Sequence, residues 1–168
     1  VYDLWHVILN KGEIPQLMEK VRSHLSSPIL VIAGNHDEFA PIREFLEVAP
    51  DAPAPLDPHD IFVSVPDGYT VEIGDEVIGF CEGRDLTVFE QNGNSPMAVL
   101  VTHEGGFGVG AERNDLAVGS DALLEHLKVC RPRYHVFGHF HHPVGPRTVY
   151  ETRCMQLSSV VSDPRQNL

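Results

Sequence analysis

Residues 28–37 read PILVIAGNHD, an apolar run that ends abruptly in a cluster of polar residues. The run is rich in β-branched side chains and is stopped by a glycine, which predicts a strand buried on both faces. The same arrangement occurs twice more, because residues 98–102 are followed by His103 and residues 134–137 by GHFHH at 138–142. Polar groups that follow buried strands of α/β proteins collect at one edge of the sheet. We therefore expect the three clusters to converge on one site.

The rest of the chain alternates between helical and strand patterns. Apolar residues have helical spacing over residues 13–25, 42–48 and 121–129. Strand patterns lie at residues 62–65, 69–73, 77–81, 148–150 and 154–157. The first three of these strands are separated by short turns, which predicts an antiparallel meander. For a chain of 168 residues we predict a single α/β domain with a sheet-on-sheet core covered by helices.

Composition limits the kinds of partner. The formal net charge is -12 and no basic run is present, so stable binding of nucleic acid is not expected. No apolar run is long enough to span a bilayer, and we expect a cytoplasmic protein without a membrane partner. The three cysteines are distant from one another, which favours neither a disulfide framework nor a thiolate zinc site. An acidic protein that binds an anionic ligand needs local positive charge, which bound metal ions can supply.

The polar clusters contain the residue types of a transition-metal site. Asn35 offers an amide oxygen, and His103, His139 and His141 offer imidazole nitrogens. This mixed set suits Zn, Mn or Fe better than Ca or metals that prefer thiolates. In an extended segment, residues two apart point to the same face, so His139 and His141 can address one cavity. Each of them then has access to a different ion if two are present.

GNHD at residues 34–37, the isolated His103 and GHFH at residues 138–141 match the last three motifs of the calcineurin-like metallophosphoesterases in order. The chain resembles that family over nearly its whole length. The resemblance implies a four-layer α/β/β/α sandwich and a centre of two divalent ions, with Mn, Fe or Zn as candidates. It also implies hydrolysis of a small-molecule phosphate monoester or diester, without deciding between them.

The resemblance assigns individual roles as well. It implies that Asn35, His103 and His139 bind one ion and that His141 binds its neighbour. His36 is implied to act on the transition state, either by stabilising the phosphoryl oxygens or by protonating the departing alkoxide. The sequence does not identify further residues that contact substrate, and it predicts no oligomeric state.

The first motifs of the family are missing. Its Asp-x-His and Gly-Asp-x-x-Asp motifs contribute an Asp, a His and the Asp that bridges both metals, and none of these is present in this chain. Because every downstream ligand is present, we interpret the chain as truncated at its N-terminus, with truncation at the C-terminus left open. If Gly-Asp stood directly before Val1, Asp3 would be the second Asp of that motif. We then expect Asp3 to orient His36, with a solvated loop residue as the equal alternative.

Several residues near the polar clusters, and the function of the chain itself, have alternative interpretations. Asp37 either orients a neighbouring imidazole or begins a helix. The glycine-rich residues 105–110 lack the Lys-Ser/Thr ending of a phosphate-binding loop and predict a loop beside the site. His135 is assigned to structure or surface. The competing function is a non-catalytic scaffold, as in the retromer subunit that keeps this fold without a working metal centre. A third possibility is a chain that binds one ion only.

Overall fold

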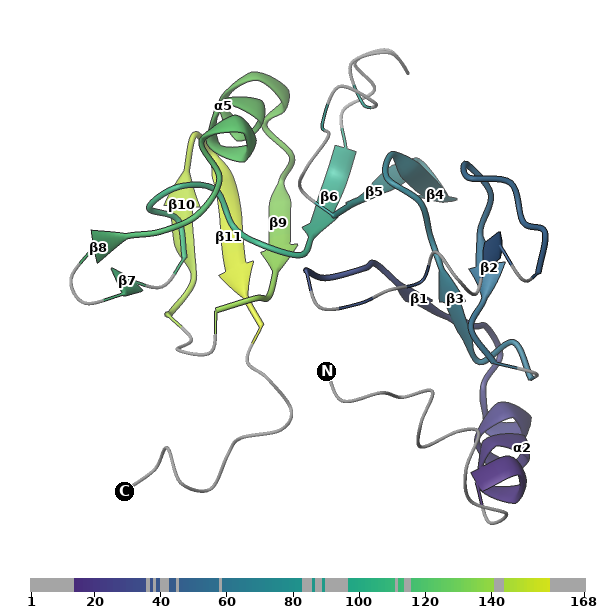
Figure 1. Cartoon of the computed structure of the whole chain (residues 1–168). Coiled ribbons are helices and arrows are strands. Elements are labelled where there is room, and N and C mark those ends of the chain that lie inside the picture. Colours follow the sequence, from purple (N-terminus) through teal and green to yellow (C-terminus); the bar gives the residue numbers. More distant parts are fainter. Residues whose placement is uncertain are drawn as a thin grey trace. The chain divides into compact units, whose positions relative to one another are not determined.

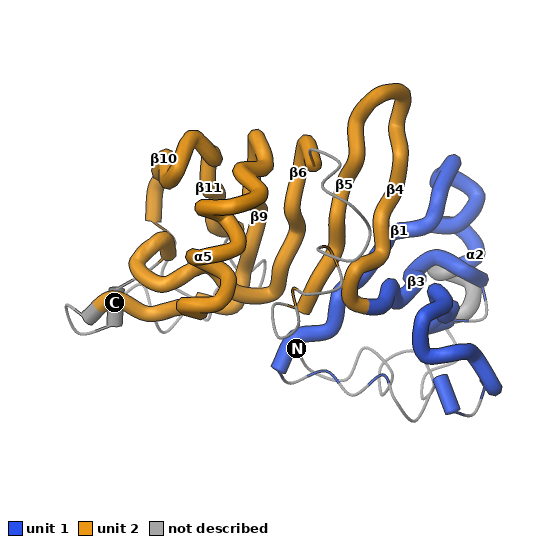
Figure 2. Tube along the Cα trace, turned by 90° about the horizontal axis from the view of Figure 1, so that it is seen from above, with its two compact units in different colours: residues 1–66 blue, residues 67–168 orange. Residues whose placement is uncertain are grey.

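The computed structural model describes residues 14–35, 37, 39, 43–44, 46–57, 59–82, 86, 89, 97–110, 112–113, 116–140 and 144–157. The chain forms two compact units, Val1–Pro66 and Asp67–Leu168, which are coloured separately in Figure 2. Each unit combines a helix with strands, so the mixed α/β class predicted from the sequence is confirmed. No helix in the described ranges has the length and apolar character needed to cross a membrane.

In the described part of the first unit, helix α2 accompanies a three-stranded sheet in the order β1-β3-β2 (Figure 1). The helix is α2 (Ile14–His24), close to the predicted bounds. Strand β1 (Ile29–Val31) pairs in parallel with β3 (Phe62–Ser64), and β2 (Ala54–Pro55) pairs antiparallel with β3. The side chains of β1 are exposed or half-buried, so the prediction of a strand buried on both faces is wrong. The reason is that β1 lies at the edge of its sheet.

The helix predicted over residues 42–48 is present only in part. Arg43 and Glu44 are helical, whereas Glu47 lies in a turn with a left-handed φ of 52°. The guanidinium group of Arg43 donates hydrogen bonds to the carbonyl oxygens of Ala49 (2.7 Å) and Pro50 (3.1 Å). These bonds hold the following segment against the end of the helical turn. Residues 42 and 45 lie outside the described residues.

The second unit is built on a six-stranded sheet in the order β10-β11-β9-β6-β5-β4 (Figure 1). Its strands are β4 (Tyr69–Ile73), β5 (Glu76–Cys81), β6 (Met97–Thr102), β9 (Tyr134–Phe137), β10 (Arg147–Val149) and β11 (Thr152–Gln156). The four central strands run parallel to one another, and β4 and β10 close the two edges in antiparallel pairs. A separate antiparallel pair joins β7 (Glu112–Arg113) to β8 (Leu116–Ala117).

The predicted three-stranded meander is wrong in one respect. Strands β4 and β5 form the expected hairpin, with Tyr69 opposite Phe80. Strand β3 instead belongs to the first unit and pairs there with β1, with Leu30 opposite Val63. Parallel partners are joined by long connections, so this pairing leaves no signal in the local sequence.

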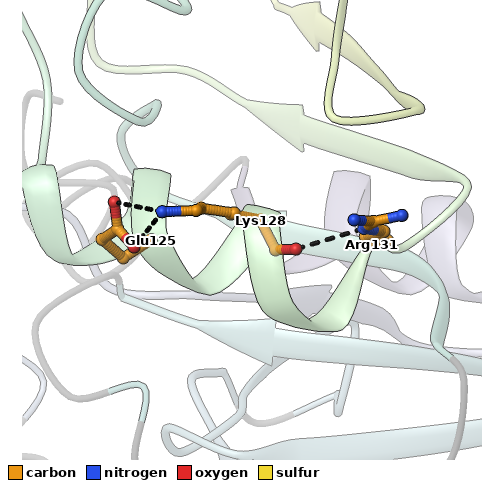
Figure 3. A network of polar contacts seen from close by, with 3 residues as sticks. All are labelled: Glu125, Lys128 and Arg131. Atoms are coloured by element: carbon orange, nitrogen blue, oxygen red, sulfur yellow. Dashed lines mark hydrogen bonds and ion pairs between the residues drawn. The ribbon is translucent and has the colours of Figure 1, made fainter.

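Helix α5 (Asp121–Cys130) has well-defined ends. Ser120 caps its N-terminus by accepting a hydrogen bond from the Leu123 N–H, which satisfies one of the free amides of the first turn. Arg131 ends the helix in a left-handed conformation, with φ 44°, and its N–H bonds to the carbonyl oxygen of Leu127. Figure 3 shows the exposed contacts near this end, where Lys128 pairs with Glu125 at 3.1 Å and the Arg131 side chain donates to the Lys128 carbonyl.

The apolar core of the second unit joins α5 to the central strands. Its buried members are Cys81, Leu86, Phe89, Met97, Leu100, Val109, Leu123, Leu127, Phe137 and Cys154. Leu123 and Leu127 of α5 are fully buried, and burial of each leucine contributes about 1.5–3 kcal/mol. Strands β6 and β9 contribute Leu100 and Phe137 to the same core. The core therefore fixes the two strands that precede His103 and GHFH.

Candidate metal centre

His103 and His139 lie just beyond the ends of two neighbouring parallel strands. Thr102 ends β6 and Phe137 ends β9, and these two residues are opposite each other in the ladder. Beyond them, the Gly138 N–H donates a hydrogen bond of 3.0 Å to the carbonyl oxygen of His103. The two imidazole rings meet edge to face, with centroids 4.7 Å apart and an interplanar angle of 66°. The fold thus brings together two of the four predicted metal ligands.

The spacing of these rings fits joint binding of one metal ion. With a metal–nitrogen distance of about 2.1 Å, a ring centroid lies about 3.2 Å from the ion, and two such rings are about 4.5–5.2 Å apart at octahedral or tetrahedral angles. The observed 4.7 Å between His103 and His139 falls inside that range. Both side chains are half-buried, which leaves them accessible to an ion. They form a nitrogen donor pair of the kind that Zn and Fe prefer.

His139 occupies the apex of a tight turn. Its φ is 65°, and the Phe140 N–H bonds to the carbonyl oxygen of Gly138 at 2.8 Å, which closes a γ-turn. A non-glycine residue in a sparsely populated conformation costs about 1–3 kcal/mol and is held there by its surroundings. One such contact is the bond from the Gln156 amide to the Phe140 carbonyl oxygen, at 2.6 Å. The extended conformation expected at His139 is therefore wrong, because β9 ends at Phe137 and the chain turns.

A buried polar network joins the same two strands. The Thr102 hydroxyl lies 2.8 Å from Nε2 of His135 and donates to the carbonyl oxygen of Glu104 at 2.5 Å. Burial lowers the pKa of His135 from its ordinary 6.5 to about 3, with a further lowering from the nearby His126. Sequence reasoning missed the link between Thr102 and His135. The available signal was a histidine inside the apolar run of a buried strand.

The glycine-rich loop after His103 is anchored to the start of α5. Ser120 donates its N–H to the Gly105 carbonyl and accepts from the Phe107 N–H, both at 3.0 Å. Gly119 makes this approach possible, since it has a φ of 126° and a Cβ there would lie 2.5 Å from the Gly106 carbonyl oxygen. The loop beside the predicted site is thus held close to the backbone that carries His103.

Asn35 belongs to the first unit, where it is exposed on the turn after β1. The Asp37 carboxylate accepts a hydrogen bond of 2.9 Å from the Gly34 N–H, and the Asp37 N–H donates to the Gly34 carbonyl oxygen at 3.0 Å. These two bonds close the turn around Asn35. Asp37 itself lies outside the helices of the described residues, and its predicted role at a helix start stays a prediction. Its predicted role in orienting an imidazole, and the place of Asn35 in the ligand set, stay predictions.

Three predicted site residues, Asp3, His36 and His141, lie outside the described residues. Within the described ranges, no three His, Cys, Asp or Glu side chains gather into a metal-binding group. The pair His103 and His139 is therefore the part of the predicted site that has a described geometry.

The family model of the calcineurin-like phosphoesterases matches residues 7–143. The match includes GNHD, His103 and GHFH and extends over most of the chain. The chain belongs to the calcineurin-like phosphoesterase family. Metal-dependent hydrolysis of phosphate esters is the activity of this family. The family predicted from the three motifs is thus confirmed, and so is the α/β fold that it implied.

A similar fold also occurs among solved structures. One crystal structure superimposes with a TM-score of 0.56 at 12% sequence identity, and it covers 83% of this chain. The aligned part makes up 60% of that structure's chain, so the present chain spans less than two thirds of its length. At this identity the likeness shows the fold alone. A search of curated proteins found no match for this phosphoesterase sequence.

Proposed function

We propose that the chain provides metal ligands and an acid group for the hydrolysis of a phosphate monoester or diester at a centre of two divalent ions, Mn, Fe or Zn. The observation that supports it best is the His103 and His139 pair, whose spacing fits one ion in a chain of this family. In this proposal Asn35, His103 and His139 bind one ion and His141 binds the other. The substrate is a small phosphate ester, since a chain of net charge -12 is poorly suited to hold a nucleic acid.

Each residue has a defined task in this proposal. When bound, the ions neutralise charge on the phosphoryl oxygens and lower the pKa of the attacking water. His103 and His139 hold their positions through the strands that precede them. Hydrolysis forms a bond from phosphorus to the water oxygen and breaks the bond to the leaving alkoxide, which departs as an alcohol after taking a proton. His36 is the proposed donor of that proton, and Asp3 is proposed to orient it.

Metal binding by the 168-residue chain tests the ligand assignment. The chain is stripped with a chelator and titrated with Zn²⁺ or Mn²⁺ by calorimetry, and the metal content is measured by mass spectrometry. We expect about one tightly bound ion, and an affinity lowered about 100-fold by His103→Ala or His139→Ala. His24→Ala is the control, because His24 is an exposed histidine of α2 outside the predicted ligand set. Equal binding by all three variants would contradict the assignment.

Hydrolysis requires the remaining ligands as well. The Asp and His residues of the first family motifs are not among the 168 residues, so activity is tested on the product of the complete gene. p-Nitrophenyl phosphate and bis(p-nitrophenyl) phosphate distinguish monoester from diester hydrolysis in the presence of Mn²⁺. We expect His36→Ala to retain metal and to lower kcat about 10²- to 10⁴-fold. A protein that neither binds metal nor hydrolyses either ester would favour the scaffold interpretation.

A further inference from the structure

We propose that Thr102 and His135 are positioning residues, which hold the backbone turn that carries His103 and thereby set the affinity of the metal site. The inference rests on the proposed function, because it takes His103 to be a metal ligand. Neither side chain needs to contact an ion or a substrate for this role.

The direction of the hydrogen bonds follows from the number of available protons. Thr102 is 2% exposed and His135 is fully buried, so neither side chain bonds to bulk water. The single hydroxyl proton of Thr102 is donated to the Glu104 carbonyl oxygen. Oγ1 must therefore accept from His135, which places the ring proton on Nε2. The result is two consecutive hydrogen bonds: His135 donates to Thr102, and Thr102 donates to the Glu104 carbonyl oxygen.

This chain of hydrogen bonds restrains the main chain on both sides of His103. The Thr102 hydroxyl spans His103 and fixes the Glu104 carbonyl, while the Gly138 N–H fixes the carbonyl of His103 itself. Both hydrogen bonds act on the backbone that carries the imidazole of His103. Restraints of this kind preserve the 4.7 Å spacing to His139 before an ion arrives.

His135 keeps one protonation state. Its Nδ1 is buried without a hydrogen-bond partner among the described residues. A proton on Nδ1 would add a buried charge and an N–H with no acceptor, and burial lowers the pKa of His135 to about 3. At neutral pH the ring is therefore neutral and donates from Nε2. Constant donation suits a residue that positions a neighbour and does not exchange protons.

Four variants separate positioning from general packing. Thr102→Val and His135→Leu remove the hydrogen-bonding groups and keep a similar volume, and each should weaken Zn²⁺ binding about 10- to 100-fold. Thr102→Ser keeps the hydroxyl and His135→Gln keeps an N–H near Nε2, so both should bind within about threefold of the wild type. The double variant Thr102→Val/His135→Leu should be no weaker than either single variant, because both act through one chain of bonds.

Thr152 provides the matched control. It is a fully buried threonine of β11 in the same sheet, and its hydroxyl has no hydrogen-bond partner among the described residues. Thr152→Val removes the same group as Thr102→Val without touching the turn at His103. Zn²⁺ affinity should therefore be unchanged in Thr152→Val.

Nitrogen NMR of the metal-free chain gives a second readout. We expect the His135 ring to be protonated on Nε2, and we expect Thr102→Val, but not Thr152→Val, to shift the ring resonances of His103. Should Thr102→Val fail to fold, the pair His135→Leu and His135→Gln makes the same comparison from the other end of the network.

The outcomes separate the two proposals. Wild-type affinity in both Thr102→Val and His135→Leu would overturn the positioning role and leave the metal site standing. A wild-type chain that binds no Zn²⁺ would overturn the proposed metal site. In that case the NMR measurement still tests the positioning role, which is overturned if the His103 ring resonances do not respond to Thr102→Val.

Discussion

The Gly138 N–H donates a hydrogen bond to the carbonyl oxygen of His103, one residue beyond the point where Thr102 faces Phe137 in the ladder. The bond joins main-chain atoms, so it does not depend on the side chain at position 103. Removing the imidazole of His103 therefore leaves the connection between the two strand ends in place. A loss of metal affinity in His103→Ala can then be attributed to the missing ligand.

The γ-turn at His139 predicts an unusual order of stabilities. His139→Gly and His139→Ala both remove the imidazole, but only glycine adopts a φ of 65° without steric cost. We expect the glycine variant to be more stable than the alanine variant by about 1 kcal/mol. The free energy of unfolding from urea titrations measures the difference. At a backbone position with an ordinary φ, the alanine variant is more stable than the glycine variant. A higher stability of His139→Ala than of His139→Gly would therefore refute the backbone strain at His139.

Burial of His135 predicts a specific loss of stability in acid. Above pH 6.5 the ring is neutral in both the folded and the unfolded chain, so it contributes no pH dependence. Between 6.5 and the folded-state pKa of about 3, only the unfolded chain binds the proton, and the free energy of unfolding falls as the pH falls. The slope approaches about 1.4 kcal/mol per pH unit, or about 3 kcal/mol between pH 7 and pH 4.

The variant His135→Gln lacks this titration. Relative to the wild type, its free energy of unfolding should therefore rise by about 3 kcal/mol when the pH is lowered from 7 to 4. Urea unfolding at several pH values measures both proteins under the same conditions, so that the other titrating groups cancel. Parallel stability curves for the two proteins would show that His135 is not held neutral by the fold.

Two glycines with different surroundings predict opposite responses to alanine. A Cβ at Gly119 would lie 2.5 Å from the carbonyl oxygen of Gly106, in a backbone conformation with φ 126°. At Gly145, no heavy atom of the described residues other than its chain neighbours lies within 4 Å of such a Cβ. We expect Gly119→Ala to destabilise the fold by about 1–3 kcal/mol or more, and Gly145→Ala to stay within about 0.5 kcal/mol of the wild type. Thermal unfolding compares them, and equal melting temperatures would contradict the tight approach at Gly119.

Cysteine reactivity offers a further check of burial. Cys154 is 2% exposed, and burial raises the pKa of its thiol to about 11. Cys130 is half-buried near the end of α5. At about pH 8 we expect iodoacetamide to modify Cys130 in the native chain and Cys154 only after unfolding, because the thiolate is the reactive form. Peptide mass spectrometry identifies the labelled residue, and rapid native labelling of Cys154 would contradict its burial.

Local sequence predicted the elements that have a strong apolar pattern. Helix α5 and strands β6 and β9 fall within one residue of the predicted ranges, since each contributes a buried face to the core. The pairing of β3 with β1 was not predictable in the same way, because a strand's partner depends on contacts far away in the sequence. The low burial of β1 was not predictable for the same reason, because its place at the edge of the sheet depends on which strand it pairs with.

The candidate site was predictable to a similar extent. Imidazoles that follow two apolar runs become neighbours when those runs pair in parallel, as His103 and His139 do. The strained backbone of His139 and the link from His135 to Thr102 were not predictable, because both depend on tertiary contacts and not on the type of the adjacent residues. Asn35 and His141 stay predictions from their motifs.

Strands β6 and β9 are adjacent in the sheet, so the register between them determines how far apart His103 and His139 lie. The length of polypeptide between the two strands does not enter into that distance. Insertions, deletions or replacements in the β7–β8 hairpin are therefore free to accumulate during divergence without relocating the two histidines.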